Sequence, residues 1–194
     1  MKNLTLADLM SIEDYNAQRP EFRQAIMEHK KSRRVPLGPN AMLHFENFRL
    51  MQYQVLELIR TEKITTENEL IEELGAYNPL IPDGSNLKVT FMLEYPDEVE
   101  RAIQLAKLID IENKILIQID GCEPVYPVAN EDLPRSTEEK TSSVHFLRFE
   151  FTQEMISAAR NGATWSIYCL HPNYQHRNND VPEHVTTSLI QDFD

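Results

Sequence analysis

The residues of this sequence that could bind or transform a ligand are concentrated in the segment 29–62. His29–Arg34 reads H-K-K-S-R-R and is a cationic run in a protein of formal net charge −12. A helix pattern follows in which Gln54, Glu57 and Arg60 recur every three residues and can pair along the helix. If these side chains turn inward, their buried polar groups could orient a ligand or acquire shifted pKa values. The alternative is surface ion pairing, worth about 0–1 kcal/mol for each pair.

The same segment contains further polar residues at the ends of its expected elements. Glu46 ends a strand pattern that begins at Ala41, and Arg49 opens the helix. The candidate binding residues of this unit are Arg33, Arg34, Glu46, Arg49, Gln54, Glu57 and Arg60. The arginines of the cationic run also have a structural interpretation, because cations at the C-terminal end of a helix stabilise the helix dipole.

Histidines supply a second, weaker set of candidates. His171, His176 and His184 follow Cys169 closely and are metal-capable residue types, but their spacing matches no standard zinc pattern. His44 and His145 lie in strand patterns and could meet across a sheet. The sequence contains no P-loop, G-x-G-x-x-G, G-x-S-x-G, H-E-x-x-H or C-x-x-C, so no cofactor or nucleophile is assigned from a motif.

Charge and composition exclude several classes of protein. Residues 1–60 carry nine basic and seven acidic side chains, whereas residues 61–194 carry ten and 24, so the acidity lies in the body of the chain. Such a body repels nucleic acid and anionic membranes. There is no apolar run long enough to cross a bilayer and no signal peptide. Two cysteines suit a reducing compartment, and we expect a cytoplasmic protein.

Hydrophobic periodicity and turn residues predict an α+β fold with a single domain. We expect a mainly antiparallel or mixed sheet with helices packed on one face, and an N-terminal helical arm (1–40) packed on the core (41–194). The predicted strands are 41–46, 87–95, 114–119, 123–128, 144–151 and 164–170. The predicted helices are a short one at 5–10, one from Pro20 to about His29, then 50–62, 66–74, 96–108, 152–160 and 182–193, with a polar loop at 171–180.

Four strings together resemble a bacterial family of unknown function whose members have about the length of this chain. They are H-K-K-S-R-R-V-P-L-G-P, H-F-E-N-F-R-L-M-Q-Y-Q-V-L-E-L-I-R-T-E, A-Y-N-P-L-I-P-D-G-S-N-L-K-V-T-F-M-L-E-Y and S-S-V-H-F-L-R-F-E-F. The resemblance implies gene neighbours encoding rubrerythrin-like proteins and iron–sulfur oxidoreductases, and hence a role near redox or oxidative-stress metabolism.

The positions of this sequence that match the family's strings add residues to the candidate set. They are Arg33, Arg34, Glu46, Arg49, Gln54, Glu57, Arg60, Glu62, Asn78, Glu94 and Arg148. Asn78 and Arg148 therefore join the candidate ligand-binding residues. The family often lacks histidine at the positions of His44 and His145, which argues against a metal role for these two.

These observations favour an accessory protein that binds a partner protein or a small anionic ligand through Arg33, Arg34 and the 46–62 region. The resemblance implies an iron–sulfur or rubrerythrin-like protein as the partner. One alternative is a metal-dependent oxidoreductase or hydrolase that uses Glu46, Glu57 and histidines. A structural subunit of an oligomer, such as a homodimer, is also left open, and no cofactor is assigned.

Overall fold

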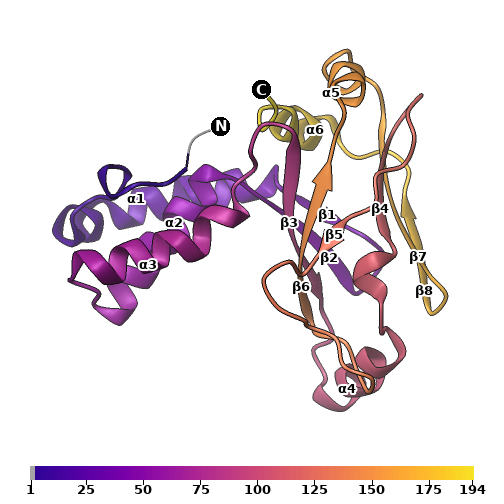
Figure 1. The fold of residues 1–194 in the computed structure, drawn as a ribbon, viewed down its shortest axis with the longest axis horizontal. Helices are drawn as coiled ribbons and strands as arrows, with labels where there is room; N and C mark the ends of the chain where they lie inside the picture. Colours follow the sequence, from indigo (N-terminus) through magenta and orange to yellow (C-terminus); the bar gives the residue numbers. More distant parts are fainter. Residues whose placement is uncertain (1–2) are drawn as a thin grey trace.

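The computed structural model describes residues 3–194 and contains two antiparallel sheets, which we call sheet A and sheet B (Figure 1). Sheet A has the strand order β1-β2-β3-β6-β5, and sheet B has the order β4-β7-β8. The strands of sheet A are β1 (Arg34–Pro36), β2 (Ala41–Glu46), β3 (Asn86–Leu93), β5 (Val128–Ala129) and β6 (Val144–Glu150). Those of sheet B are β4 (Ile115–Ile119), β7 (Trp165–His171) and β8 (Tyr174–Asn178).

The main hydrophobic core joins the inner faces of the two sheets. Side chains of a strand alternate between faces, and in β3 the residues Leu87, Val89, Phe91 and Leu93 are buried at every second position. They belong to one cluster with residues of sheet B such as Trp165, which is 1 % exposed. The opposite face of sheet A is therefore left to carry polar and half-buried side chains.

Three helices form a separate layer on the outer side of sheet A (Figure 1). They are α1 (Ile12–Lys31), α2 (Phe48–Glu62) and α3 (Glu67–Tyr77). Side-chain caps from Ser11, Asn47 and Thr66 accept the first free backbone N–H groups and determine where these helices begin. The apolar faces of the helices make a second hydrophobic cluster around Ile26 and Val55. The helical layer thus includes α2 and α3 in addition to the N-terminal arm that the sequence predicted.

The remaining helices are short and lie at the ends of the sheets (Figure 1). They are α4 (Glu98–Lys107), α5 (Gln153–Arg160) and α6 (Glu183–Ile190), with 3₁₀ turns η1 (Leu6–Asp8), η2 (Asn78–Leu80) and η3 (Ile111–Asn113). Within residues 3–194, no helix is both long enough and apolar enough to cross a bilayer.

The α+β fold that the sequence predicted is confirmed, with differences in detail. The first long helix begins at Ile12 rather than at Pro20, because Ser11 caps it and the proline is accommodated inside it. Helix α3 continues past Gly75 to Tyr77. The expected strands 114–119 and 123–128 meet at one bridge, between Ile117 and Val125, while β4 pairs along its length with β7. The expected polar loop 171–180 contains strand β8, whose mixed sequence hides the strand pattern.

Candidate functional site

The outer face of sheet A brings together three polar residues and one aromatic residue from four strands in one row. The register pairs Arg34 with His44, His44 with Thr90, and Thr90 with Phe146. Directly opposed residues on one face of an antiparallel sheet have neighbouring side chains. Arg34, His44, Thr90 and Phe146 therefore form a continuous ladder, although they come from segments far apart in the sequence.

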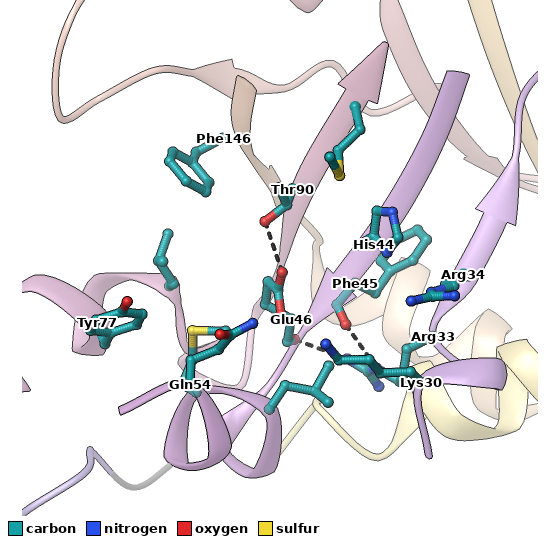
Figure 2. A pocket seen from close by; sticks show the side chains of 14 residues that line it. Lys30, Arg33, Arg34, His44, Phe45, Glu46, Gln54, Tyr77, Thr90 and Phe146 are labelled. Carbon is teal, nitrogen blue, oxygen red and sulfur yellow. Dashed lines mark hydrogen bonds between the residues drawn. The ribbon is translucent and has the colours of Figure 1, made fainter. Parts of the chain in front are cut away.

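A cavity of about 410 Å³, which we call the basic cavity, lies between this ladder and the helical layer. Figure 2 shows Glu46 near its middle, with Tyr77 and Phe146 to one side and His44 and Arg34 to the other. Its lining residues are Lys30, Arg33, Arg34, His44, Phe45, Glu46, Leu50, Met51, Gln54, Tyr77, Leu80, Thr90, Met92 and Phe146. The cavity therefore combines one polar, mostly cationic end with an apolar end.

Two of the cations that line the cavity have no ionic partner among residues 3–194. None of the ion pairs among the described residues includes Lys30 or Arg34. The Lys30 ammonium group lies 5.7 Å from the ring centroid of Tyr53, and burial lowers the pKa of this lysine. Arg34 is exposed at the edge strand β1. Two unpaired cations beside a cavity are an arrangement that an anion would stabilise.

Glu46 places one carboxyl group beside these cations. Its Oε1 atom accepts a hydrogen bond of 2.7 Å from the Thr90 hydroxyl, as Figure 2 shows. Burial raises the pKa of Glu46, while the Thr90 hydrogen bond and the charges of Lys30 and Arg33 act in the opposite direction. Burial is the larger of these effects, so the pKa of Glu46 lies above its usual value.

His44 contributes a polar atom that has no hydrogen-bond partner in the described part of the chain. Its Nε2 atom is buried and makes no hydrogen bond within the described part of the chain. Burial lowers the pKa of His44 to about 4, with the charges of Arg34 and Lys30 adding to the effect. The ring is thus neutral at pH 7. A buried polar atom without a hydrogen bond costs about 1–3 kcal/mol, which a ligand atom placed in the cavity would relieve.

Arg33 lines the cavity but uses its guanidinium group for the fold. Its Nε donates to the Phe45 carbonyl at 3.1 Å, and its Nη2 donates to the Glu46 carbonyl at 2.9 Å. It also donates to the Ser188 carbonyl at 3.0 Å and forms an ion pair with Asp192. With the side chain 1 % exposed and these donors occupied, Arg33 supports the cavity wall.

A comparison with models of known protein families shows the family of this chain. A family model described as "Protein of unknown function (DUF3501)" matches residues 3–193. The chain belongs to this family.

A solved structure from Burkholderia pseudomallei K96243, described as a novel protein of unknown function, shares 41 % sequence identity with a TM-score of 0.94. The alignment covers 100 % of both chains. No curated protein matches the chain. The likeness extends over the whole fold, and because neither description names an activity, the function has to be argued from the site.

Glu57 and Arg60, which the sequence grouped with Gln54, are absent from the lining of the basic cavity. The Glu57 carboxylate accepts a hydrogen bond of 2.5 Å from the buried Tyr15 hydroxyl. It also accepts two from Arg19, at 2.6 and 2.8 Å. The Arg60 Nε lies 4.0 Å from the same carboxylate. Only Gln54 of the three lines the cavity, because α2 presents Glu57 to α1.

The other predicted binding residues lie at three different places. Arg49 is exposed on α2. Asn78 exchanges hydrogen bonds of 2.7 and 3.0 Å with the backbone of Leu4. Arg148 lies on the same sheet face as the basic cavity, in a neighbouring hollow, where it pairs with Glu131 and Glu150.

The histidines proposed as metal ligands do not converge within the described residues. His171 is buried with its Nε2 3.0 Å from the Ile109 carbonyl, His176 packs against the Tyr174 ring, and His184 is exposed. His145 is 0 % exposed and hydrogen-bonded to Asn130 and Thr141. Across residues 3–194 there is no group of three or more His, Cys, Asp or Glu side chains that could hold a metal ion.

Sequence reasoning missed the contributions of Lys30, Tyr77, Thr90 and Phe146 to the cavity. The available signal was the alternation in the strands, which puts Thr90 and Phe146 on the face opposite the core. Lys30 was treated as one of several cations at a helix end. Its position facing the cavity depends on how α1 packs on sheet A, which the local pattern does not contain.

Proposed function

We propose that this protein binds a small anionic ligand in the basic cavity. The observation that carries the proposal is that Lys30 and Arg34 line the cavity without an ionic partner among the described residues. An anion placed between them would also find the unpartnered Nε2 atom of His44. Together these groups offer charged and neutral donors on one side of a half-enclosed space, which is the arrangement that charge-assisted anion binding uses.

The shared location of Lys30 and Arg34, more than their lack of an ion pair, supports the site. Although carboxylates are in excess in this protein, seven of the 18 Lys and Arg side chains in residues 3–194 form an ion pair. Lys30 and Arg34 differ from most of the other unpaired cations because both line the same cavity. Two uncompensated cations at one cavity wall support a site that an external anion completes.

A calorimetric titration with inorganic phosphate and with acetate tests the proposal. We expect Lys30→Gln and Arg34→Gln each to weaken binding tenfold or more, because a hydrogen bond to a charged group contributes about 1.5–3 kcal/mol. Lys31→Gln is the matched control: it removes a lysine next to Lys30 whose side chain is 71 % exposed. If the wild-type protein binds neither anion, or if all three variants bind like wild type, the proposal is wrong.

The redox setting and the partner are a separate part of the proposal and rest on the family resemblance. We propose that the protein acts in the cytoplasm as an accessory to an iron–sulfur or rubrerythrin-like protein. A homodimer is left open as its oligomeric state. Co-purification of such a protein with the untagged chain, lost in an Arg34→Glu variant, would support it. A preparation that contains this chain alone would contradict it. No observation on the described residues favours the metal-dependent enzyme.

A further inference from the structure

The basic cavity adjoins a second, larger hollow along the outer face of sheet A. This second cavity has a volume of about 800 Å³ and shares Tyr77, Leu80 and Phe146 with the basic cavity. Figure 2 shows Tyr77 and Phe146 on the side of the basic cavity that faces away from Arg34. The two hollows are thus neighbours, and the three shared, largely apolar side chains lie at the boundary between them; we call the pair of hollows the groove.

The two ends of this groove differ in charge. In the second cavity Arg148 pairs with Glu131 at 2.7 Å and also with Glu150. Glu73, Asp132 and Glu131 there outnumber the two cations of the lining, Lys88 and Arg148. The second cavity therefore offers no excess positive charge, and the rest of its lining is apolar or small, with residues such as Pro79, Leu80 and Val89.

The basic cavity, by contrast, has an excess positive charge that one negative charge would balance. Arg33 is neutralised by Asp192, which leaves Lys30 and Arg34 against the single carboxyl group of Glu46. With Glu46 ionised, the excess is one positive charge, and His44 adds a neutral ring without a second charge. One monoanionic group, such as a carboxylate, would balance this end, whereas a dianion would leave the cavity with excess negative charge.

We infer that the ligand is an amphipathic carboxylic acid whose carboxylate lies at Lys30 and Arg34 and whose apolar chain or ring extends past Leu80 and Phe146 into the second cavity. This inference rests on the proposed function, because it requires that the basic cavity binds an anion. It adds the class of ligand: one charge, an apolar body, and a length that spans both hollows. The apolar body would remain away from the charged groups that bind the head.

A chain-length series tests the inference on the intact protein. The probes are acetate, hexanoate, octanoate and octan-1-ol, each titrated calorimetrically below its aggregation concentration. Because a buried methylene group strengthens binding about fourfold, octanoate should bind on the order of tenfold more tightly than hexanoate. Octan-1-ol, which has the same chain without the charge, should bind at least tenfold more weakly than octanoate.

A variant in the second cavity tests whether the apolar part of the ligand binds there. Ala76 is exposed on α3 and lines only the second cavity, so Ala76→Glu adds a charge there without disturbing the core. The ratio of octanoate to acetate affinity should fall by tenfold or more in Ala76→Glu. It should not change in Ala102→Glu, which alters an exposed alanine of α4 that lines neither cavity.

The outcomes separate this inference from the function on which it rests. If acetate and phosphate bind but affinity does not rise with chain length, the amphipathic ligand is wrong and anion binding stands. If octan-1-ol binds as tightly as octanoate, the charged head is not recognised and the inference is wrong. If none of the anions binds, both the inference and the proposed function are wrong.

Discussion

Arg33 at the end of α1 forms a buried ion pair with Asp192, a residue 159 positions later in the chain. The side chains are 1 % and 7 % exposed. Burial raises the pKa of Asp192, and the nearby Arg33 opposes this shift. The pair connects the wall of the basic cavity to the C-terminal segment. It also separates Arg33, whose charge is neutralised inside the protein, from its sequence neighbour Arg34, whose charge is not.

Breaking this pair should destabilise the protein strongly. Removing one partner of a buried ion pair leaves an uncompensated charge, which costs about 3–5 kcal/mol. We expect Arg33→Met to lower the free energy of unfolding by about that amount in urea denaturation. Arg34→Met, at the adjacent exposed position, should change it by less than about 1 kcal/mol. Equal effects of the two substitutions would contradict the division of roles between these arginines.

His44 and His145 should respond oppositely to replacement by phenylalanine. The buried Nε2 atom of His44 has no hydrogen bond to lose, so His44→Phe should leave the urea midpoint unchanged or higher while weakening anion binding. His145→Phe removes hydrogen bonds to Asn130 and Thr141 at 3.1 and 3.0 Å. It should therefore lower the free energy of unfolding by about 2 kcal/mol or more. Loss of stability in His44→Phe would show that this ring supports the fold.

Glu46 should make anion binding depend on pH. Burial raises its pKa, and the groups that act on it are Thr90, Lys30 and Arg33, with neutral His44 as a neighbour on the same strand face. As the pH falls through this raised pKa, the carboxyl group takes up a proton and its negative charge is lost from the cavity. The affinity for acetate should therefore rise.

Glu46→Gln removes this charge at every pH. The variant should bind acetate more tightly than wild type at neutral pH, and its affinity should no longer change with pH. Calorimetry at a series of pH values at which acetate stays ionised measures both effects. A pH dependence that persists unchanged in Glu46→Gln would show that another group titrates.

Glu57 should stabilise the contact between α1 and α2. Hydrogen bonds from Arg19 and then Tyr15 lower its pKa from 4.5 to about 2, although burial opposes the shift. A lowered folded-state pKa means that the stabilisation is fully present above pH 4.5 and is lost as the pH falls towards 2. We expect Glu57→Gln to lower the free energy of unfolding by about 1–2 kcal/mol at neutral pH.

The decisive part of the test is how the difference in stability between wild type and Glu57→Gln depends on pH. The gap in urea midpoint between wild type and Glu57→Gln should narrow as the pH falls below about 4.5. Glu72→Gln, at an exposed position of α3, should behave like wild type throughout. A gap that stays constant down to low pH would show that the carboxylate charge makes no contribution.

The sequence predicted the parts of the fold that depend on local sequence patterns. The alternation of Leu87, Val89, Phe91 and Leu93 is a local pattern that predicts β3, and a capping residue such as Thr66 is a local signal for a helix start. Strand β8 was missed because its sequence Y-Q-H-R-N has almost no apolar alternation, and its pairing with β7 supplies the stability instead. The division into two sheets depends on pairings between distant segments, which no local pattern contains.

The site was predicted in the same uneven way. Arg34, Glu46 and Gln54 were found because the charge run and the following helix lie together in sequence. Thr90 and Phe146 join them through strand register, which sets every opposed pair and cannot be read from one strand alone. Glu57 was grouped with Gln54 by helical spacing, but a three-residue step along a helix also rotates the side chain, and α1 occupies the direction to which Glu57 turns.

The most direct test of anion binding in the basic cavity is an NMR titration of the labelled wild-type protein with acetate, beside the double variant Lys30→Gln/Arg34→Gln. Saturable chemical-shift changes in the wild type should centre on Lys30, Arg34, His44 and Glu46, and they should be absent from the variant. Changes that do not saturate, that map elsewhere on the molecule, or that persist in the variant would contradict the account.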